Sequence, residues 1–344
     1  MIRPKRLKVG DKIAIVSLSW GGLGDEAFRH RYEIAKERLE NEFNLEVVTM
    51  PHALKGTSFI QKHPELRAKD LMDAFQDTSI SAIFSAIGGD DSIRLLPYID
   101  YDIIRKNPKI FMGYSDTTIT HLMLYKAGIT SFYGPAIMSE FGEYVEMMPY
   151  SKKAVEEILF ADTTALLIES SKEWSDDFVF WDEKNKHLAK KMKAENYGYE
   201  VLQGEGKVKG HLLGGCLDVF MMCIGTEIWP DINKWENAIL FIETSEDKPS
   251  PEFVKWTFRN LAAQGILKKI SGIIVGKPQG EVHYEAYKET ILEVVSEEEG
   301  LSNLAIFYNI NIGHAMPTGI LPYGIEVELD CELKQIKLLE SATQ

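Results

Sequence analysis

The sequence has 344 residues, of which 45% are hydrophobic and 26% charged, as in an ordinary globular protein. This length predicts two domains or one large domain. The formal net charge of −14 predicts a surface that repels phosphate backbones, so nucleic-acid binding is not expected, although a local pocket can still hold a small nucleotide-like ligand. No stretch of about 18 consecutive apolar residues occurs, so we expect no membrane-spanning helix.

The N-terminal segment starts with basic residues and continues into a short apolar run at 13–18. This run has the length of a strand, which is too short for the core of a signal peptide, and no small-residue cleavage site follows it. We therefore expect a cytoplasmic protein. The three cysteines, Cys216, Cys223 and Cys331, form no CxxC pair, which argues against a disulfide framework or a zinc site and favours structural burial.

Strand and helix patterns alternate through the first half of the chain. Such alternation predicts a parallel sheet with both faces covered, and ligands of such sheets gather at the carboxyl ends of the strands. Residues that directly follow a strand are therefore the first candidates for a site. The expected elements, in chain order, are a strand at 12–18, a helix at 26–43, a strand at 45–50, a helix at 64–75, a strand at 80–87, a short helix at 93–99, a strand at 109–113 and a helix at 117–127.

A long connection interrupts this alternation before it resumes. Residues 173–182 are rich in aromatic and acidic side chains without a clean period, and long connections of this kind are often lids or linkers. We expect an N-terminal domain at 1–168, a linker and substrate-covering loop at 169–205, and a C-terminal domain at 206–344. Within the last of these, the expected elements are a glycine-rich and then apolar segment at 210–223, a strand at 238–242, a helix at 251–264, a strand at 272–275, a helix at 284–299, a strand at 305–312 and a hairpin at 324–339.

The segment Phe111-Met112-Gly113-Tyr114-Ser115-Asp116-Thr117 places a serine between a strand and a helix. A serine in such a turn is exposed near a helix N-terminus, where free backbone N–H groups favour negative charge. This is the arrangement of a nucleophile elbow, although the GxSxG string of the α/β hydrolases is absent. The alternative is that Ser115 or Asp116 only caps the helix.

Two further reactive groups follow strands in the second half of the chain. Glu243 closes the apolar run AILFI, and His314 follows NINIG. Each alone has an ordinary structural interpretation, but a serine nucleophile needs a base, and the base needs a carboxylate that fixes its tautomer. Ser115, Glu243 and His314 are therefore the predicted catalytic residues. The turn Gly88-Gly89-Asp90-Asp91 also follows a strand, and its N–H groups are suited to bind an oxyanion.

The set GGDD, GYSD, ETSED and NIGHAMPTGILPYG, with the opening RLKVGDKIAIVS, resembles the serine peptidases that include the LD-carboxypeptidases and the microcin C immunity proteins. The resemblance covers nearly the whole chain. It implies an α/β fold, with an N-terminal Rossmann-like parallel-sheet domain that carries the nucleophile Ser115. It also implies a C-terminal, β-rich α/β domain that carries Glu243 and His314, and an oxyanion hole formed by the N–H groups of Gly89 and Asp116. A homodimer without metal or cofactor is implied as well.

The chain departs from the family at two places. The family's Gly-Gly-Asn-Leu is Gly214-Gly215-Cys216-Leu217 here, so a substrate contact at Cys216 would be changed. The first turn reads SLSWGG where many members have a proline–serine pair. Neither departure touches the predicted catalytic residues.

Members of the family cleave different bonds. Some remove a terminal D-amino acid from a muropeptide tetrapeptide, and others cleave the amide between an aminoacyl group and a nucleotide-like moiety. Trp181, with Phe178 or Phe180, is suited to stack on a purine, which favours the second substrate. The alternative is that these rings only pack the loop onto the domain. Lys248 and Lys277 are candidate partners for a substrate carboxylate, and the alternative is that both are solvated surface lysines. Gly88, Asp90 and Cys216 are further candidate substrate contacts.

Two other classes of function remain as alternatives. A kinase-like nucleotide-binding protein could use the Gly-Gly-Asp turn to hold phosphate, but no GxxxxGK[ST] string is present. A solute-binding module would usually be exported, and no export signal is apparent. The eight histidines are scattered without HExxH, so no metal site is expected.

Overall fold

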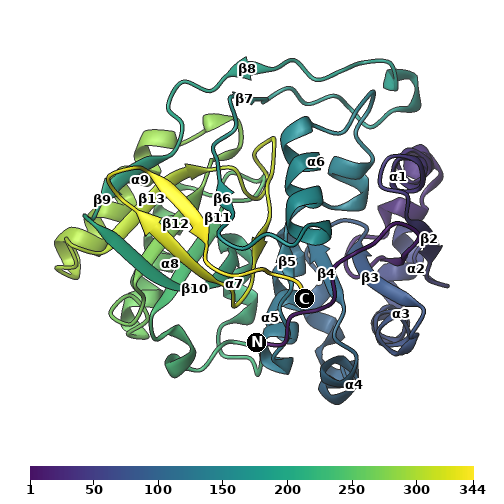
Figure 1. The fold of residues 1–344 in the computed structure, drawn as a ribbon, viewed down its shortest axis with the longest axis horizontal. Coiled ribbons are helices and arrows are strands. Elements are labelled where there is room, and N and C mark those ends of the chain that lie inside the picture. Colours follow the sequence, from purple (N-terminus) through teal and green to yellow (C-terminus); the bar gives the residue numbers. More distant parts are fainter. The chain divides into compact units, whose positions relative to one another are not determined.

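The computed structural model describes residues 1–344, which form two compact units. Unit 1 consists of Met1–Asp162, Asp177–Lys191 and Ala342–Gln344, and unit 2 consists of Thr163–Asp176 and Met192–Ser341. The chain thus passes twice between the units within the segment that the sequence marks as a linker. In Figure 1 the largest part of unit 1, Met1–Asp162, runs from purple through blue to teal, and most of unit 2 is green and yellow.

Unit 1 is built on a parallel sheet with the strand order β5-β4-β3-β1-β2. The central strands are buried along nearly their whole length, which explains why their sequences are continuous apolar runs instead of alternating patterns. The strands are β1 (Lys12–Val16), β2 (Glu46–Thr49), β3 (Ile80–Ser85), β4 (Ile110–Gly113) and β5 (Phe132–Tyr133).

The helices of unit 1 follow these strands as crossover connections. Pro64 starts α3, where its missing N–H costs nothing, and Gly128 ends α5 in a left-handed conformation with φ of 84°. The predicted helices at 64–75 and 117–127 are confirmed. The helices are α1 (Arg29–Asn41), α2 (Thr57–Lys62), α3 (Pro64–Gln76), α4 (Tyr101–Lys106), α5 (Thr118–Ala127) and α6 (Pro149–Val155).

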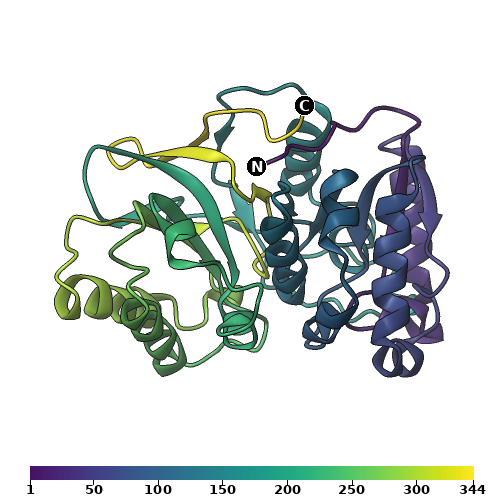
Figure 2. The same ribbon diagram turned by 90° about the horizontal axis from the view of Figure 1, so that it is seen from below.

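Unit 2 contains an eight-stranded sheet with the order β6-β16-β15-β10-β11-β12-β13-β9. Its four central strands, β10 to β13, are parallel, and antiparallel strands flank them on both sides. Figure 2 shows the yellow β15–β16 hairpin along the green strand β10. The strands are β6 (Leu167–Ile168), β9 (Glu200–Gln203), β10 (Lys207–Cys216), β11 (Ala238–Glu243), β12 (Gly272–Gly276), β13 (Ala305–Ile310), β15 (Glu326–Asp330) and β16 (Gln335–Leu338).

The other elements of unit 2 are helices and short strands. The predicted helix at 251–264 is confirmed as α8, and its first turn is capped by the Ser250 hydroxyl, which accepts from the Phe253 N–H. The elements are α7 (Leu217–Cys223), α8 (Pro251–Ala263), α9 (Tyr284–Leu292), β14 (Leu321–Pro322) and the antiparallel pair β7 (Glu173–Trp174) and β8 (Lys193–Ala194).

The predicted fold class, an α/β chain with an N-terminal parallel sheet and a β-rich C-terminal unit, is confirmed. In each unit the candidate site residues follow the carboxyl ends of central parallel strands, as expected for such sheets. None of the helices is both long and apolar enough to span a membrane. The homodimer that the resemblance implies stays a prediction.

Candidate active site

Ser115 lies in a sharp turn between β4 and α5. Its φ of 65° is in the left-handed region, which is rare for a residue with a side chain and is typical of a strained, functional turn. Its backbone N–H donates to the Tyr133 hydroxyl at 3.0 Å, which anchors the turn to β5. One 3₁₀ turn, Ser115–Thr117, then leads directly into α5. The local backbone is therefore that of a nucleophile elbow, with the serine partly exposed.

The turn Gly88–Asp91 packs directly against Ser115. A side chain at Gly88 would place its Cβ 2.6 Å from the Ser115 Cβ and 2.7 Å from the Oγ, so only glycine fits here. The buried Asp116 carboxylate ties the turn to the elbow, because its Oδ2 accepts from the backbone N–H groups of Asp91 at 3.1 Å and Ser92 at 2.8 Å. Sequence reasoning considered the backbone of Asp116 but missed this role of its side chain.

The two N–H groups predicted to form an oxyanion hole lie in this region. Gly89 is exposed and has φ of 138°, a conformation that side chains rarely adopt. Neither the Gly89 N–H nor the Asp116 N–H donates to an acceptor within unit 1. Asp116 is buried, and a buried N–H without an acceptor is uncommon in folded proteins, whereas the exposed Gly89 N–H is open to an external acceptor. Ser115, Asp116 and the turn Gly88–Asp91 are hereafter the unit 1 half-site.

Glu243 and His314 lie together in unit 2. Glu243, the last residue of β11, is only 1% exposed, and its Oε2 accepts from the His314 Nδ1 at 2.8 Å and from the His314 backbone N–H at 3.2 Å. Gly313 permits this contact, because a Cβ at that position would lie 2.2 Å from the Glu243 carboxyl group. The pair fixes the imidazole tautomer that carries its proton on Nδ1. Glu243 and His314 are hereafter the unit 2 half-site.

A second carboxylate contacts the other nitrogen of His314. The Glu246 Oε2 lies 2.9 Å from the His314 Nε2. Burial disfavours a charged imidazole, but the Glu243 and Glu246 carboxylates outweigh it and raise the pKa of His314 to about 10. The hydrogen bond from His314 in turn lowers the pKa of Glu246 to about 2. No sequence signal separated Glu246 from the other acids of the segment ETSED.

Cys216 ends β10 beside Glu243, its register partner on β11. Its sulfur, a Glu243 carboxylate oxygen and a His314 ring nitrogen all lie within 4.8 Å of one another, and all three residues are buried. Burial raises the pKa of the Cys216 thiol well above its usual value, so the thiol is protonated beside the Glu243 carboxylate.

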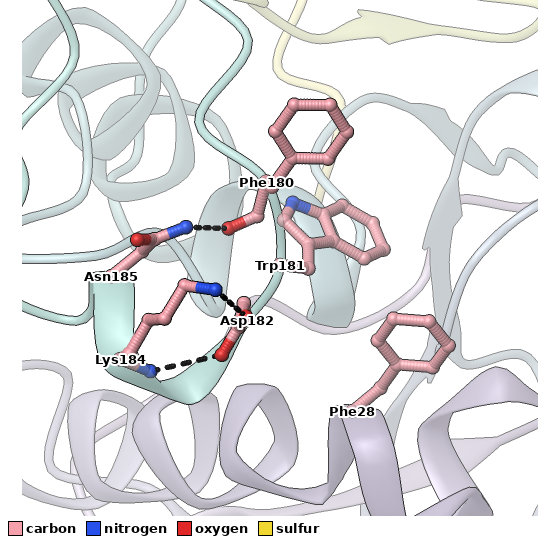
Figure 3. Close-up of a pocket in the computed structure, with 6 residues that line it drawn as sticks. All are labelled: Phe28, Phe180, Trp181, Asp182, Lys184 and Asn185. Carbon is pink, nitrogen blue, oxygen red and sulfur yellow. Dashed lines mark hydrogen bonds and ion pairs between the residues drawn. The ribbon is translucent and has the colours of Figure 1, made fainter.

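An aromatic pocket of about 420 Å³ lies in unit 1, on the segment Asp177–Lys191 and the neighbouring turn before α1 (Figure 3). Two hydrogen bonds shape its rim: the Asn185 side chain donates to the Phe180 carbonyl at 3.0 Å, and the Lys184 N–H donates to Asp182 at 3.2 Å. The pocket is lined by Phe28, Phe180, Trp181, Asp182, Lys184 and Asn185. Of these residues, the sequence had singled out only Trp181 and Phe180.

Trp181 is held in place from one side. The Arg31 guanidinium lies 4.6 Å from the centre of the Trp181 ring and also 4.6 Å from that of Tyr144, so the cation is sandwiched between the two rings. Arg31 is completely buried and donates to the Met138 carbonyl at 2.9 Å. Phe28 meets Trp181 edge-on at 6.3 Å. The indole is thus a fixed wall of the pocket.

The other residues predicted to contact substrate do not line the aromatic pocket. Phe178 is 60% exposed and packs edge-on against Phe180 at 5.1 Å, outside the residues that line the pocket. Asp90 and Lys248 are exposed. Lys277 is fully buried, and its Nζ already has three acceptors: Glu281 at 2.6 Å, Glu195 at 3.0 Å and Asn309 at 3.2 Å. Its charge is therefore balanced within unit 2.

Comparison with known families covers both units. Residues 13–134 match the LD-carboxypeptidase N-terminal domain, and residues 209–329 match the LD-carboxypeptidase C-terminal domain. A Vibrio cholerae protein named as a carboxypeptidase is 31% identical, with 98% of each chain covered. The microcin C7 self-immunity protein MccF of Escherichia coli is 32% identical, over 80% of this chain and 78% of that protein.

Solved structures show the same relationship. An MccF-like protein from Streptococcus pneumoniae, solved in complex with AMP, has a TM-score of 0.88 and 37% identity, covering 96% of this chain and 98% of that one. MccF in complex with aspartyl sulfamoyl adenosine has a TM-score of 0.86 and 28% identity, with both chains fully covered. The chain therefore belongs to the LD-carboxypeptidase family of serine peptidases, with MccF among its relatives.

Proposed function

We propose that the protein is an MccF-like amidase in which Ser115, His314 and Glu243 form one catalytic triad. Its substrate is an amide between an aminoacyl or peptidyl group and a nucleotide-like moiety, so the activity is a detoxification of the microcin C type. The observation that supports the triad is the buried Glu243–His314 pair. Its carboxylate holds a proton on Nδ1, so Nε2 is the nitrogen that can serve as the base for a serine.

The chemistry divides between the two half-sites. Because Glu243 occupies Nδ1, Nε2 is the nitrogen that takes the proton from the Ser115 hydroxyl as its oxygen attacks the amide carbonyl. The same nitrogen then gives this proton to the departing nitrogen of the nucleotide-like part. Water, activated in the same way, hydrolyses the ester on Ser115 and restores the free serine.

The carbonyl oxygen becomes negative during each attack, and we assign its stabilisation to the N–H groups of Gly89 and Asp116. Support comes from their lack of an acceptor within unit 1 and from the close packing of the Gly88 turn against Ser115. Removal of one such donor typically costs about 3 to 4 kcal/mol of transition-state stabilisation.

The choice of a nucleotide-like leaving group is based on the aromatic pocket. Trp181, backed by Arg31, presents a fixed ring to a purine, and the pocket belongs to the same unit as Ser115. Related proteins bind ligands of this chemistry: AMP in the Streptococcus pneumoniae protein and aspartyl sulfamoyl adenosine in MccF. The alternative is a muramoyl-tetrapeptide LD-carboxypeptidase, for which such a ring has no evident purpose.

A side-by-side assay tests the proposal. The purified protein is given an aminoacyl sulfamoyl adenosine and, separately, a muropeptide tetrapeptide that ends in D-alanine. We expect release of the amino acid from the first and little turnover of the second. Ser115→Ala should abolish release while leaving the thermal melting curve intact. Preferential cleavage of the tetrapeptide would favour the LD-carboxypeptidase alternative. Full activity of Ser115→Ala would contradict the serine mechanism.

A further inference from the structure

Both ring nitrogens of His314 lie within hydrogen-bonding distance of a carboxylate. Nδ1 lies 2.8 Å from Glu243, and Nε2 lies 2.9 Å from Glu246. A carboxylate at neutral pH only accepts, so each nitrogen must carry a proton, and the ring is an imidazolium. A ring in this form has no lone pair with which to take a proton from a serine. The state seen here is therefore a resting state of the base.

The two carboxylates differ in how firmly they are held. Glu243 is the buried end of β11. Glu246 lies in the turn that follows, and its side chain is 63% exposed. The backbone of this turn is fixed one residue earlier, where Ser245 donates to the Asp218 carboxylate from its N–H at 3.0 Å and from its hydroxyl at 3.1 Å. The Glu246 side chain can thus leave Nε2 by side-chain rotation alone.

Within unit 2, the titratable groups around the imidazole are the carboxylates Glu243 and Glu246 and the thiol of Cys216. Burial raises the pKa of that thiol, which keeps it neutral, so both charges next to His314 are negative. A cationic group that entered beside the imidazole would pair with Glu246, whereas an anionic group would be repelled by it.

We propose that Glu246 is a specificity-determining latch, which holds His314 as an imidazolium until the ammonium of an aminoacyl substrate takes over the Glu246 carboxylate. This inference rests on the proposed function, in which Nε2 must be free to serve Ser115. When the latch opens, Glu246 exchanges one cationic partner for another. The proton on Nε2 passes to water, and His314 remains neutral with Nδ1–H held by Glu243. Substrates without this ammonium leave the latch closed.

Kinetics on a matched pair of substrates test the latch. Alanyl sulfamoyl adenosine carries the ammonium, and its propionyl analogue differs only in lacking it. We expect the wild-type protein to prefer the alanyl compound, and Glu246→Gln to lower the ratio of the two kcat/KM values by about 10-fold or more. The acid limb of the propionyl pH profile should also move at least about one unit lower, because the variant no longer stabilises the imidazolium.

Asp247→Asn is the matched control, because it neutralises the adjacent exposed carboxylate, which makes no ion pair with His314. It should leave both the ratio and the pH profile at the wild-type values. An unchanged ratio in Glu246→Gln, or an equal change in Asp247→Asn, would overturn the specificity role.

An NMR titration of the His314 ring nitrogens separates the latch from the proposed function, since it needs no turnover. We expect the wild-type imidazolium to persist to higher pH than that of Glu246→Gln by at least about one unit, also in a Ser115→Ala background. Equal titration in both proteins would refute the latch even if hydrolysis were normal. If no substrate were cleaved but the titrations differed as expected, the proposed hydrolysis would be refuted, whereas the contact between Glu246 and His314 would be supported.

Discussion

The two half-sites are organised by different forces. In the unit 1 half-site, backbone conformation dominates: Ser115 has φ of 65°, Gly89 has φ of 138°, and two N–H groups have no acceptor within the unit. In the unit 2 half-site, charge dominates, because the buried His314 lies between the carboxylates of Glu243 and Glu246. In the proposed mechanism, the first arrangement binds the developing oxyanion, and the second controls where a proton resides.

This difference predicts which substitutions harm each region. Changes of charge that preserve shape should alter pH profiles when they fall in the unit 2 half-site. In the unit 1 half-site, damage should follow from changes that loosen the backbone, with little effect on pH dependence.

Glu243→Gln should have the largest effect. The amide keeps the shape of the side chain but can present its NH₂ group to Nδ1, which favours the wrong imidazole tautomer. We expect kcat to fall by about 10⁴-fold, as for comparable triads. Rates measured at saturating substrate give kcat without a contribution from substrate binding. A loss below tenfold would show that Glu243 does not orient the base.

Asp116→Asn should reduce kcat by up to about 100-fold. The two N–H groups of Asp91 and Ser92 then lose a charged acceptor, so the turn that packs against Ser115 is positioned less well. KM and the pH limits should stay near the wild-type values, because no titrating group of the reaction changes. A shifted acid limb would contradict the assignment of this half-site to backbone geometry.

Trp181→Ala should lower kcat/KM for nucleotide amides by about 10-fold, within the 1 to 3 kcal/mol expected for one stacking contact. Turnover of a muropeptide, if measurable, should not change. Phe178→Ala is the control, because this ring lies on the same segment but does not line the pocket. Equal losses for the two variants would remove the argument for stacking.

The smallest effect concerns stability. Because the pKa of His314 is raised on folding, protonated His314 adds to the free energy of unfolding. This contribution is complete below about pH 6.5 and is lost as the pH rises through about 10. Because the pKa of Glu246 is lowered on folding, ionised Glu246 also adds to the free energy of unfolding. This contribution is complete above about pH 4.5 and is lost as the pH falls through about 2. The stability difference between wild type and Glu246→Gln should therefore be largest between about pH 4.5 and 6.5.

Because Glu246 is largely exposed, this difference should stay below about 1 kcal/mol. Urea unfolding at pH 5.5 and at pH 9.5 measures it. A difference that grows toward high pH would contradict the sign of the argument.

The unit 1 half-site was the more predictable from sequence. Its largely apolar strands end at or shortly before the motifs GGDD and GYSD, so the turns could be located without knowing the fold. Strand β10 was harder, because the sequence of Lys207–Cys216 contains glycines at 210, 214 and 215 that weaken a strand pattern. The structure explains Gly214: a Cβ there would lie 1.7 Å from the Phe241 carbonyl oxygen.

Contacts that depend on packing could not be predicted in the same way. The buried Lys277 pairs with Glu195, which is 82 residues earlier in the chain, and no local pattern indicates this partner. Glu246 likewise has no local pattern that distinguishes it from Asp247. Long-range partners of charged side chains depend on tertiary structure, and a single sequence does not record them.

The central claim is that His314 in unit 2 activates Ser115 in unit 1. A serine-directed fluorophosphonate tests it directly, because the rate at which the probe phosphonylates a serine depends on the base that removes the hydroxyl proton. We predict that peptide mapping will find the label on Ser115, and that His314→Ala will label far more slowly while remaining folded. Labelling of Ser115 at the wild-type rate in His314→Ala, or labelling of another residue, would contradict the account.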